Sequence, residues 1–372
     1  MPETGEVKGC LPRAVQLTFE EDQYEYAPVG GLPALREKVA SLYNRLYRQG
    51  KQSQYTADNV AISGGGRAAL ARIAASLGSI NMGHFIPDYT AYEELLHIFR
   101  AFNPIPLPLH PEHGYRIGVA RLAEQIESLG LGALLVSNPC NPTGQVIQGE
   151  ELKEWVSLCK RLDCTCIFDE FYSHYIYGQK QGHSVSAAAY VNDVNTDPVV
   201  IVDGLTKNWR YPGWRICWTV GPGSVIEAVT SAGSFLDGGA NHPLQRAALS
   251  LLEGSDSFAD TESLQKHFSV KKKYMVSRLR SMGLEIDSEP QGGFYCWVNL
   301  QTLPEPLRDG MRFFEERLKE KVITVPGIFF DVNPVKRRST SRYQSYSRLS
   351  FGPEMKVLER GLNALEAVIR KF

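Results

Sequence analysis

The amino-acid sequence predicts an α/β protein with a mostly parallel sheet covered by helices on both faces, followed by a smaller α+β unit. Between residues 60 and 220, short apolar strands alternate with helical stretches, a pattern typical of parallel βαβ units. After about residue 250 this alternation stops, and long helices flank one alternating strand at 292–300. The length of 372 residues accommodates two domains.

The elements follow from apolar periodicity and from turn residues. The expected strands of the large unit lie at residues 60–62, 84–87, 133–137, 164–169, 199–203 and 215–220. The expected helices lie at 32–47, 67–77, 150–162, 258–282, 311–321 and 354–371. We therefore expect a large cofactor-binding domain over residues 31–250, a small α+β domain over 251–372, and an N-terminal segment, 1–30, associated with the small domain.

Composition and charge narrow the class of protein. The formal net charge is −1, so nothing indicates a nucleic-acid or membrane-surface partner. No stretch reaches membrane-spanning length, and the N-terminus lacks the apolar core of a signal peptide. The seven cysteines form no pair of CxxC motifs, which favours a reducing compartment; no metal site is expected. We therefore expect a cytoplasmic protein.

Chemically versatile residues follow the strands at their carboxyl ends, where open α/β sheets bind ligands. The glycines of 63–67 open a helix whose free N–H groups suit a phosphate. Two Asn-Pro pairs make a rigid turn that holds the Asn141 amide. The strand 199–203 leads to Lys207, and Arg215 follows eight residues later. Each feature alone also has an ordinary explanation, as a tight turn, a helix cap or a solvated loop.

One cofactor, pyridoxal 5′-phosphate, would use all of these residues together. Lys207 would form the Schiff base and move protons at the substrate α-carbon, and Asp169 would pair with the ring nitrogen. Asn141 and Tyr172 would hydrogen-bond the phenolic oxygen. Tyr89 is predicted to stack on the ring. The residues predicted to hold the phosphate are Gly65, Gly66, Arg67 and Arg215.

These motifs resemble those of one family, the class I/II aminotransferases among the fold-type I pyridoxal-phosphate enzymes. The resemblance is carried by SNPCNPTG (137–144), DEFY (169–172), TKNWRYPGWRICW (206–218) and RLSF (348–351), with support from 26–36 and 290–297. It implies a seven-stranded sheet in the large domain. It also implies that Arg348, with Asn141, binds the substrate α-carboxylate. Tyr26 would reach the phosphate of a neighbouring subunit, in a homodimer with shared active sites.

The sequence also departs from the family pattern. Gly204 stands where a phosphate-binding serine is usual, and the segment before residue 26 is short. In the unusual stretch 234–248 we expect His242 to be structural, the alternative being a position near the cofactor. The long basic segment 327–348 is expected to be a mobile flap, or else to attract an acidic substrate group.

The predicted reaction is amino-group transfer from an amino acid to a 2-oxo acid. A lyase or cyclase using the same cofactor chemistry is the alternative, because pocket geometry selects among these outcomes. A non-enzymatic regulator is disfavoured because no DNA-binding segment precedes the large unit. No second arginine for a side-chain carboxylate is evident, so strict dicarboxylate specificity is not supported. The sequence does not identify the amino acid.

Overall fold

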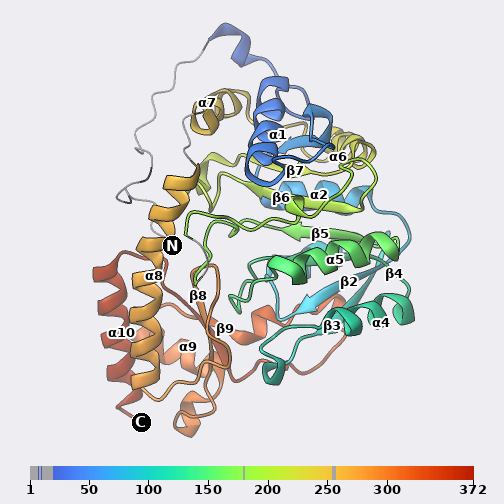
Figure 1. Ribbon diagram of the computed structural model, residues 1–372. Coiled ribbons are helices and arrows are strands. Elements are labelled where there is room, and N and C mark those ends of the chain that lie inside the picture. The colour runs from blue at the N-terminus through green and yellow to red at the C-terminus, as the bar shows by residue number, and fades with distance from the viewer. Residues whose placement is uncertain (1–6, 8–9, 11–19, 179–180, 254–256) are drawn as a thin grey trace.

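A computed structural model describes the chain except for residues 1–6, 8–9, 11–19, 179–180 and 254–256. The large sheet has seven strands in the order β1-β7-β6-β5-β4-β2-β3 (Figure 1). The strands are β1 (Val60–Ser63), β2 (Asn81–Ile86), β3 (Asn103–Pro108), β4 (Leu131–Ser137), β5 (Thr165–Asp169), β6 (Val199–Gly204) and β7 (Cys217–Val220). Six of these strands run in one direction, and β7 runs antiparallel to them. The predicted mostly parallel, seven-stranded sheet is therefore confirmed.

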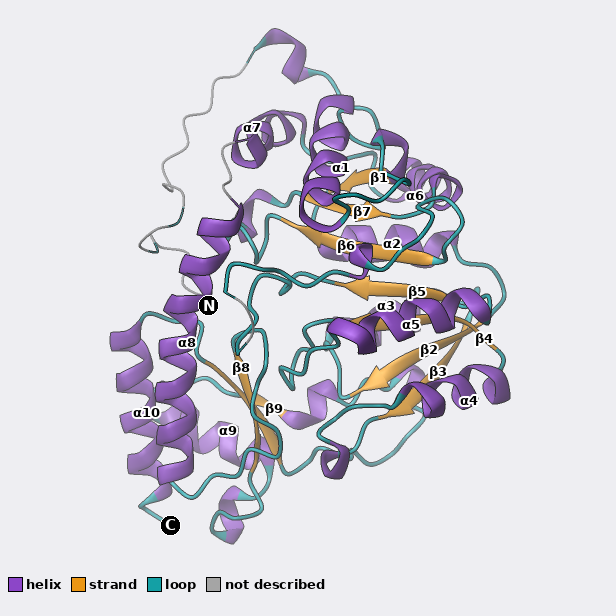
Figure 2. Ribbon diagram, viewed as in Figure 1, coloured by secondary structure: helices purple, strands orange, loops and turns teal. Residues whose placement is uncertain are grey.

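Helices cover both faces of this sheet (Figure 2). They are α1 (Pro33–Tyr47), α2 (Gly66–Ser76), α3 (Ala91–Ile98), α4 (Val119–Leu129), α5 (Gly149–Arg161), α6 (Gly223–Leu236) and α7 (His242–Glu253). Alternate residues of β6 belong to two separate apolar clusters: Val200 and Val202 lie with α2, α3 and α6, whereas Val199 and Ile201 lie with α1, α4 and α5. A two-residue side-chain period thus supplies a core to each face.

One strand was not predicted from the sequence. The sequence of β3 is NPIPLP, and prolines argue against a strand because they donate no ladder hydrogen bond. Strand β3 is at the edge of the sheet and pairs only with β2, in parallel. An edge strand leaves one side of its backbone unpaired, so alternate prolines are accommodated there.

The C-terminal part contains a three-stranded antiparallel sheet in the order β8-β10-β9. Its elements are α8 (Ser257–Ser281), β8 (Tyr295–Asn299), α9 (Gly310–Lys319), β9 (Val325–Pro326), β10 (Tyr346–Ser350) and α10 (Met355–Ile369). The parallel strands of the large sheet point toward this smaller sheet, and α8 and α10 pack together beside it (Figure 2). The predicted α+β character is confirmed. Within the N-terminal segment 1–30, most of the residues before residue 20 lie outside the described part of the chain.

The basic segment 327–348 is not the free flap that we expected. Lys336 forms an ion pair with Glu93 of α3 at 2.5 Å, and Arg338 pairs with Asp331 at 2.6 Å. The Tyr343 hydroxyl donates to the backbone oxygens of Ile86 and Leu109 at 3.1 and 3.2 Å. The bonds of Lys336 and Tyr343 attach the segment to α3 and to the end of β2, and the Arg338 ion pair lies within the segment.

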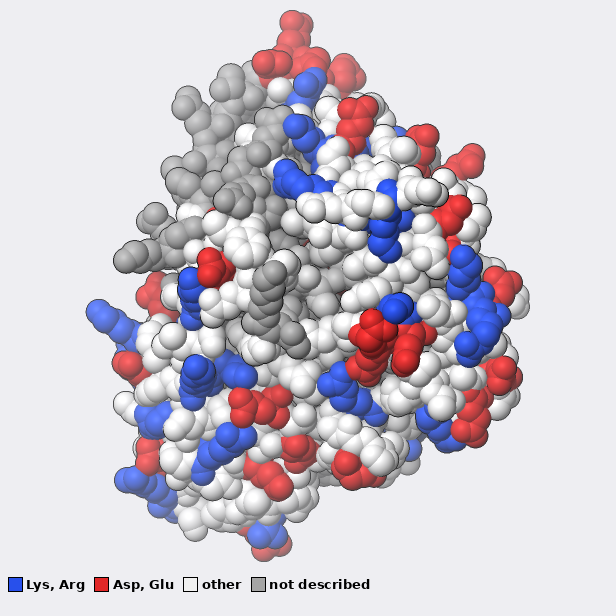
Figure 3. Space-filling model, in the orientation of Figure 1, with Lys and Arg blue, Asp and Glu red and all other residues white. Residues whose placement is uncertain are grey.

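The charged side chains are interspersed over the face shown in Figure 3, with Lys and Arg next to Asp and Glu. Among the described helices, none is long and apolar enough to cross a membrane.

Candidate active site

The carboxyl ends of β4, β5 and β6 open onto a cavity of about 560 Å³. It is lined by nine of the residues that the sequence pointed to: Gly66, Arg67, Tyr89, Asn141, Asp169, Tyr172, Lys207, Arg215 and Arg348. They come from both the large unit and β10 of the small sheet, which brings Arg348 over the strand ends. Gly65 adjoins the same cavity through Arg215, and Tyr26 does not line it.

The turn between β6 and β7 places Lys207 in this cavity. The Asn208 amide donates to both carboxylate oxygens of Asp203 at 2.9 and 3.0 Å, which fixes the start of the turn. We expected Arg215 just inside the second strand, but it precedes β7, after the 3₁₀ turn Pro212–Trp214. Its backbone is left-handed, with φ 55°, so the side chain turns back toward the cavity instead of following the strand alternation.

Gly204, a departure from the family pattern, has a steric explanation. It pairs with Cys217 in the antiparallel ladder, and a Cβ atom at Gly204 would lie 2.4 Å from the Cys217 Cβ. No side chain fits at this distance, so the serine that is usual there is excluded by the close approach of β6 and β7.

The phosphate-binding end of the cavity is formed where α2 begins. Gly65 has φ 106°, and a Cβ there would lie 2.0 Å from a guanidinium nitrogen of Arg215. Glycine therefore allows the Arg215 guanidinium to lie against the helix N-terminus, where the first N–H groups have no intrahelical acceptor. Thr206 lines the cavity, and its buried hydroxyl has no hydrogen-bond partner in the described structure. This donor set fits a phosphate group.

The surroundings of Lys207 favour the neutral form of its amine. Burial lowers the pKa of Lys207, the positive charges of Arg348 and Arg215 lower it further, and Asp169 opposes them. A neutral amine is the form that attacks an aldehyde and accepts a proton, so this environment suits a nucleophile and a base.

Asp169 lies at the end of β5, fully buried. Burial raises its pKa to about 6, and hydrogen bonds from Tyr92 and the Phe171 backbone oppose that rise. The Tyr92 hydroxyl donates to Asp169 Oδ2 at 2.8 Å. A buried carboxylate is favoured by a cationic partner, which a protonated pyridine nitrogen would provide. Tyr92 was not predicted, although it lies three residues after Tyr89 in the first turn of α3.

Arg348 is oriented by two aromatic rings and an amide. Its guanidinium lies 4.0 Å from the Tyr295 ring centroid and 4.8 Å from that of Phe330. One of its nitrogens donates to Asn141 Oδ1 at 2.7 Å. Tyr295 also contacts the Tyr172 hydroxyl, with 3.0 Å between the two oxygens. The rings restrict the planar fork, which suits bidentate binding of a carboxylate.

Asp88 is a buried carboxylate that ties these elements together. It accepts hydrogen bonds from the Ser137 hydroxyl and from the backbone N–H of Tyr89, the latter at 2.7 Å. The Ser137 oxygen accepts from the Asn141 N–H at 3.2 Å, and the Asp88 N–H donates to the Phe330 oxygen at 3.1 Å. Burial raises the pKa of Asp88 to about 8. This residue was not predicted, because nothing in the sequence shows that β2 and β4 end side by side.

Two further predicted positions lie elsewhere. Tyr26 is 93% exposed and follows the 3₁₀ turn Glu21–Tyr24. His242 begins α7, with its Nδ1 3.0 Å from the Glu25 backbone oxygen, and it does not line the cavity of its own chain. Its contact attaches α7 to the N-terminal segment.

The donors in this cavity fit pyridoxal phosphate: a helix N-terminus with Arg215 for the phosphate, Asp169 for the ring nitrogen, and Lys207 for the aldehyde. The fold and the site thus define a pyridoxal-phosphate enzyme. The chain belongs to the aminotransferase class I and II family, whose model matches residues 5–365. It is therefore a pyridoxal-phosphate-dependent aminotransferase, transferring amino groups between amino acids and 2-oxo acids.

Individual relatives agree with this assignment. An aspartate aminotransferase of Pyrococcus horikoshii is 25% identical, covering 96% of this chain and 86% of the relative. A probable N-acetyl-LL-diaminopimelate aminotransferase of Bacillus subtilis is 27% identical, covering 96% and 85%. The structure of an aspartate aminotransferase from Thermus thermophilus with maleate shares the fold, with a TM-score of 0.80, 24% identity, and coverage of 94% and 85%. These relatives favour transamination over the lyase or cyclase alternative.

Proposed function

We propose that Lys207 is the catalytic amine of this aminotransferase and that Arg348 and Asn141 bind the α-carboxylate of the amino-acid substrate. The observation that carries the proposal is the position of Lys207 in one cavity with Asp169, Arg215 and Arg348, where its pKa is lowered. Pyridoxal phosphate supplies an aldehyde carbon and an electron-accepting ring. The protein binds, orients and moves protons around it.

Each group has a defined task in this proposal. Arg348 binds both carboxylate oxygens and so turns the substrate α-carbon toward Lys207. The Lys207 amine would be placed to take the α-proton of the substrate and to give a proton back. Asp169, held by Tyr92, would pair with the ring nitrogen of the cofactor, whose ring supplies the electron-accepting chemistry. Tyr89 would stack on the ring, and Asn141 and Tyr172 would hydrogen-bond the phenolic oxygen.

A titration of the yellow holoenzyme with single amino acids tests the proposal. Addition of a donor should abolish the absorption of the lysine-bound cofactor and release one equivalent of the matching 2-oxo acid. Addition of a different 2-oxo acid should restore the colour. Release of ammonia, carbon dioxide or a cyclised product in place of the 2-oxo acid would contradict amino-group transfer.

We further propose a homodimer in which Tyr26 reaches the phosphate of the neighbouring subunit. Tyr26 and Tyr24 are 93% and 80% exposed, and large exposed aromatic side chains are typical of interaction surfaces. Mixing Lys207→Ala subunits with Tyr26→Ala subunits tests this. In a shared-site dimer, half of the sites in the hybrid contain both substitutions and the other half contain neither, so activity should be recovered. No recovery in hybrids shown to have formed would contradict shared sites.

We propose a cytoplasmic location, because all seven cysteines are free and five of them are buried as thiols. We also retain as proposals the large domain over residues 31–250, the small domain over 251–372, and the association of residues 1–30 with the small domain. In support of the last, the Cys10 thiol donates to the Asp260 oxygen of α8 at 3.4 Å.

A further inference from the structure

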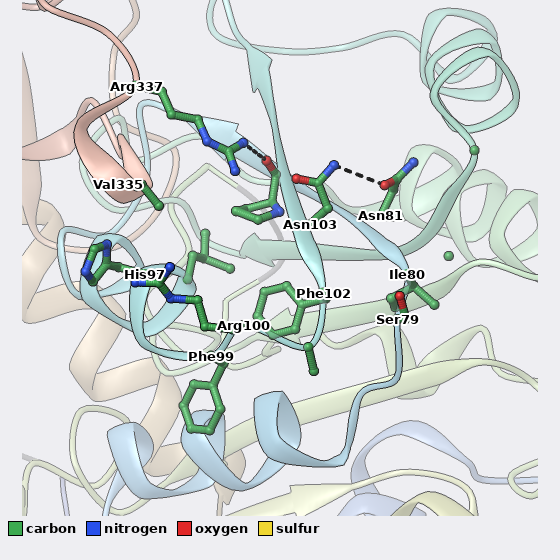
Figure 4. Close-up of a pocket in the computed structure, with 15 residues that line it drawn as sticks. Ser79, Ile80, Asn81, His97, Phe99, Arg100, Phe102, Asn103, Val335 and Arg337 are labelled. Carbon is green, nitrogen blue, oxygen red and sulfur yellow. Dashed lines mark hydrogen bonds between the residues drawn. The ribbon is translucent and has the colours of Figure 1, made fainter.

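A second cavity lies at the opposite end of the strands of the large sheet. Its volume is about 700 Å³, and it is formed where β2, β3 and β4 begin, beside the end of α3 and the 3₁₀ turn Pro334–Lys336. Figure 4 shows His97 and Arg100 from the α3 end, Asn81 and Asn103 from the strands, and Val335 and Arg337 from the turn. The cavity therefore joins residues between 79 and 132 to the turn at 335–337, which is far from them in sequence.

The formally charged side chains that line this cavity are two arginines, Arg100 and Arg337. His97, Arg100 and Arg337 line it, and none of the described residues that line it is Asp or Glu. Within the described part of the chain, these three side chains form no ion pair; Arg337 donates only to the Pro104 backbone oxygen, at 3.2 Å. The residues on either side of Arg337 do form ion pairs: Lys336 with Glu93, and Arg338 with Asp331. Arg337 and Arg100 thus retain guanidinium donors for another group.

The rest of the lining is of two kinds. The Asn103 amide donates to Asn81 Oδ1 at 3.2 Å, and the Asn81 amide donates to the Leu129 oxygen at 2.7 Å, so the two amides are held in place. Phe99, Ile80 and Val335 add apolar surface. A volume of this size is in the range of small-molecule sites, which combine apolar walls with a few polar groups.

We propose that this cavity binds a small organic anion, a carboxylate or a phosphate monoester that carries an apolar group. The guanidinium groups of Arg100 and Arg337 would bind the anionic group, since their planar forks match carboxylate and phosphate oxygens. Phe99, Ile80 and Val335 would contact the apolar group.

The proposed site is separate from the active site. Strand β4 begins at Leu131, next to the second cavity, and ends at Ser137, which lines the first. Six residues of strand, at about 3.3 Å each, separate the two sites by roughly 20 Å. The inference therefore does not depend on the proposed roles of Lys207 or Arg348, and a binding measurement tests it without turnover.

Calorimetric titration of the holoenzyme with phenyl phosphate tests the proposal, because the bound cofactor already occupies the phosphate site of the first cavity. We expect saturable binding that is stronger than for inorganic phosphate or for phenol. Arg100→Gln and Arg337→Gln should each weaken it by about tenfold. Arg121→Gln is the matched control, since Arg121 is an exposed arginine of α4 that pairs only with Glu124 in the described structure. Benzoate distinguishes a carboxylate site from a phosphate site when its binding is compared between the parent and Arg100→Gln, because Arg348 of the active site can also bind a carboxylate.

All three variants should keep the turnover of the parent enzyme, which shows that they fold. The absence of saturable binding of both phenyl phosphate and benzoate up to about 10 mM, far weaker than typical ligand affinities, would overturn the proposal. Equal binding by Arg100→Gln, Arg337→Gln and the Arg121→Gln control would overturn it as well, because the anion would then bind elsewhere.

Discussion

The parallel strands of the large sheet end at one side, here called the carboxyl edge, and begin at the opposite side, the amino edge. The two edges differ in how their charges are arranged. At the carboxyl edge, charges of both signs lie together: Lys207 near Asp169, and Arg348 on an amide and two aromatic rings. At the amino edge, Arg100 and Arg337 face a cavity without a carboxylate among its described lining residues. Mixed charges tune pKa values for proton transfer, whereas charges of one sign attract a ligand of the other. The same sheet thus offers two kinds of site.

The largest effect should follow from removing the amine at the carboxyl edge. We expect Lys207→Ala to lower kcat by at least about 10⁴-fold, because a nucleophile and a proton carrier are lost together. Single-turnover kinetics and the visible spectrum measure this. Lys153→Ala, at an exposed lysine of α5, is the control and should retain activity. Substantial turnover by Lys207→Ala would disprove the assignment.

The next effect compares an arginine at each edge. Arg348→Lys should lower kcat/KM by about 10²-fold, since a lysine cannot form the two parallel bonds to a carboxylate. Arg100→Lys should leave kcat/KM unchanged. Steady-state kinetics with a saturating 2-oxo acid measures both variants. An equal loss in the two would show that the edges are not functionally distinct.

Backbone contact at the carboxyl edge gives a stability prediction. Gly204→Ser should destabilise the protein by about 2–3 kcal/mol, because β6 and β7 must separate to admit a side chain. Gly213→Ser is the matched control: a Cβ there has nothing within 4 Å, so only a small change is expected. Urea unfolding of both variants measures the difference, and similar midpoints would contradict the steric explanation of Gly204.

A smaller effect should follow from the hydrogen bond between Tyr92 and Asp169. That bond lowers the pKa of Asp169, so Tyr92→Phe should raise it and move the acid limb of the pH–kcat profile to higher pH. We expect a fall in kcat of about tenfold at neutral pH. The pH dependence of the cofactor absorption provides a readout apart from activity. An unshifted profile would show that the bond only stabilises the fold.

The last prediction concerns Asp88, whose pKa is raised to about 8 in the folded protein from an ordinary value near 3.8. Between these values the folded state binds more protons than the unfolded state, so Asp88 makes stability fall as pH rises through this window. Asp88→Asn should reduce that slope by up to about 1.4 kcal/mol per pH unit. Urea unfolding at pH 5, 6 and 7 measures it. Parallel curves for variant and parent would contradict the raised pKa.

A residue's place in the structure could be predicted from the sequence where a few neighbouring residues determine it. Asp169 ends a strand, Lys207 and Asn141 lie within four residues of strand ends, and parallel strands bring their carboxyl ends together. The prolines of β3 hid an edge strand, because only the sheet shows which side of the strand is unpaired. Arg215 was placed in the strand because apolar alternation begins before the ladder does.

The sequence by itself determined the fold class, the family and nine of the residues that line the active-site cavity, because strand ends and rigid turns are encoded over a few consecutive residues. The tertiary structure alone decided which partners hold those residues. Contacts between segments far apart in the chain produce the hydrogen bond from Tyr92 to Asp169 and the packing of Tyr295 and Phe330 against Arg348. Such a contact also excludes a side chain at Gly204. Such contacts leave no periodic pattern in the sequence, because packing selects them by shape and distance.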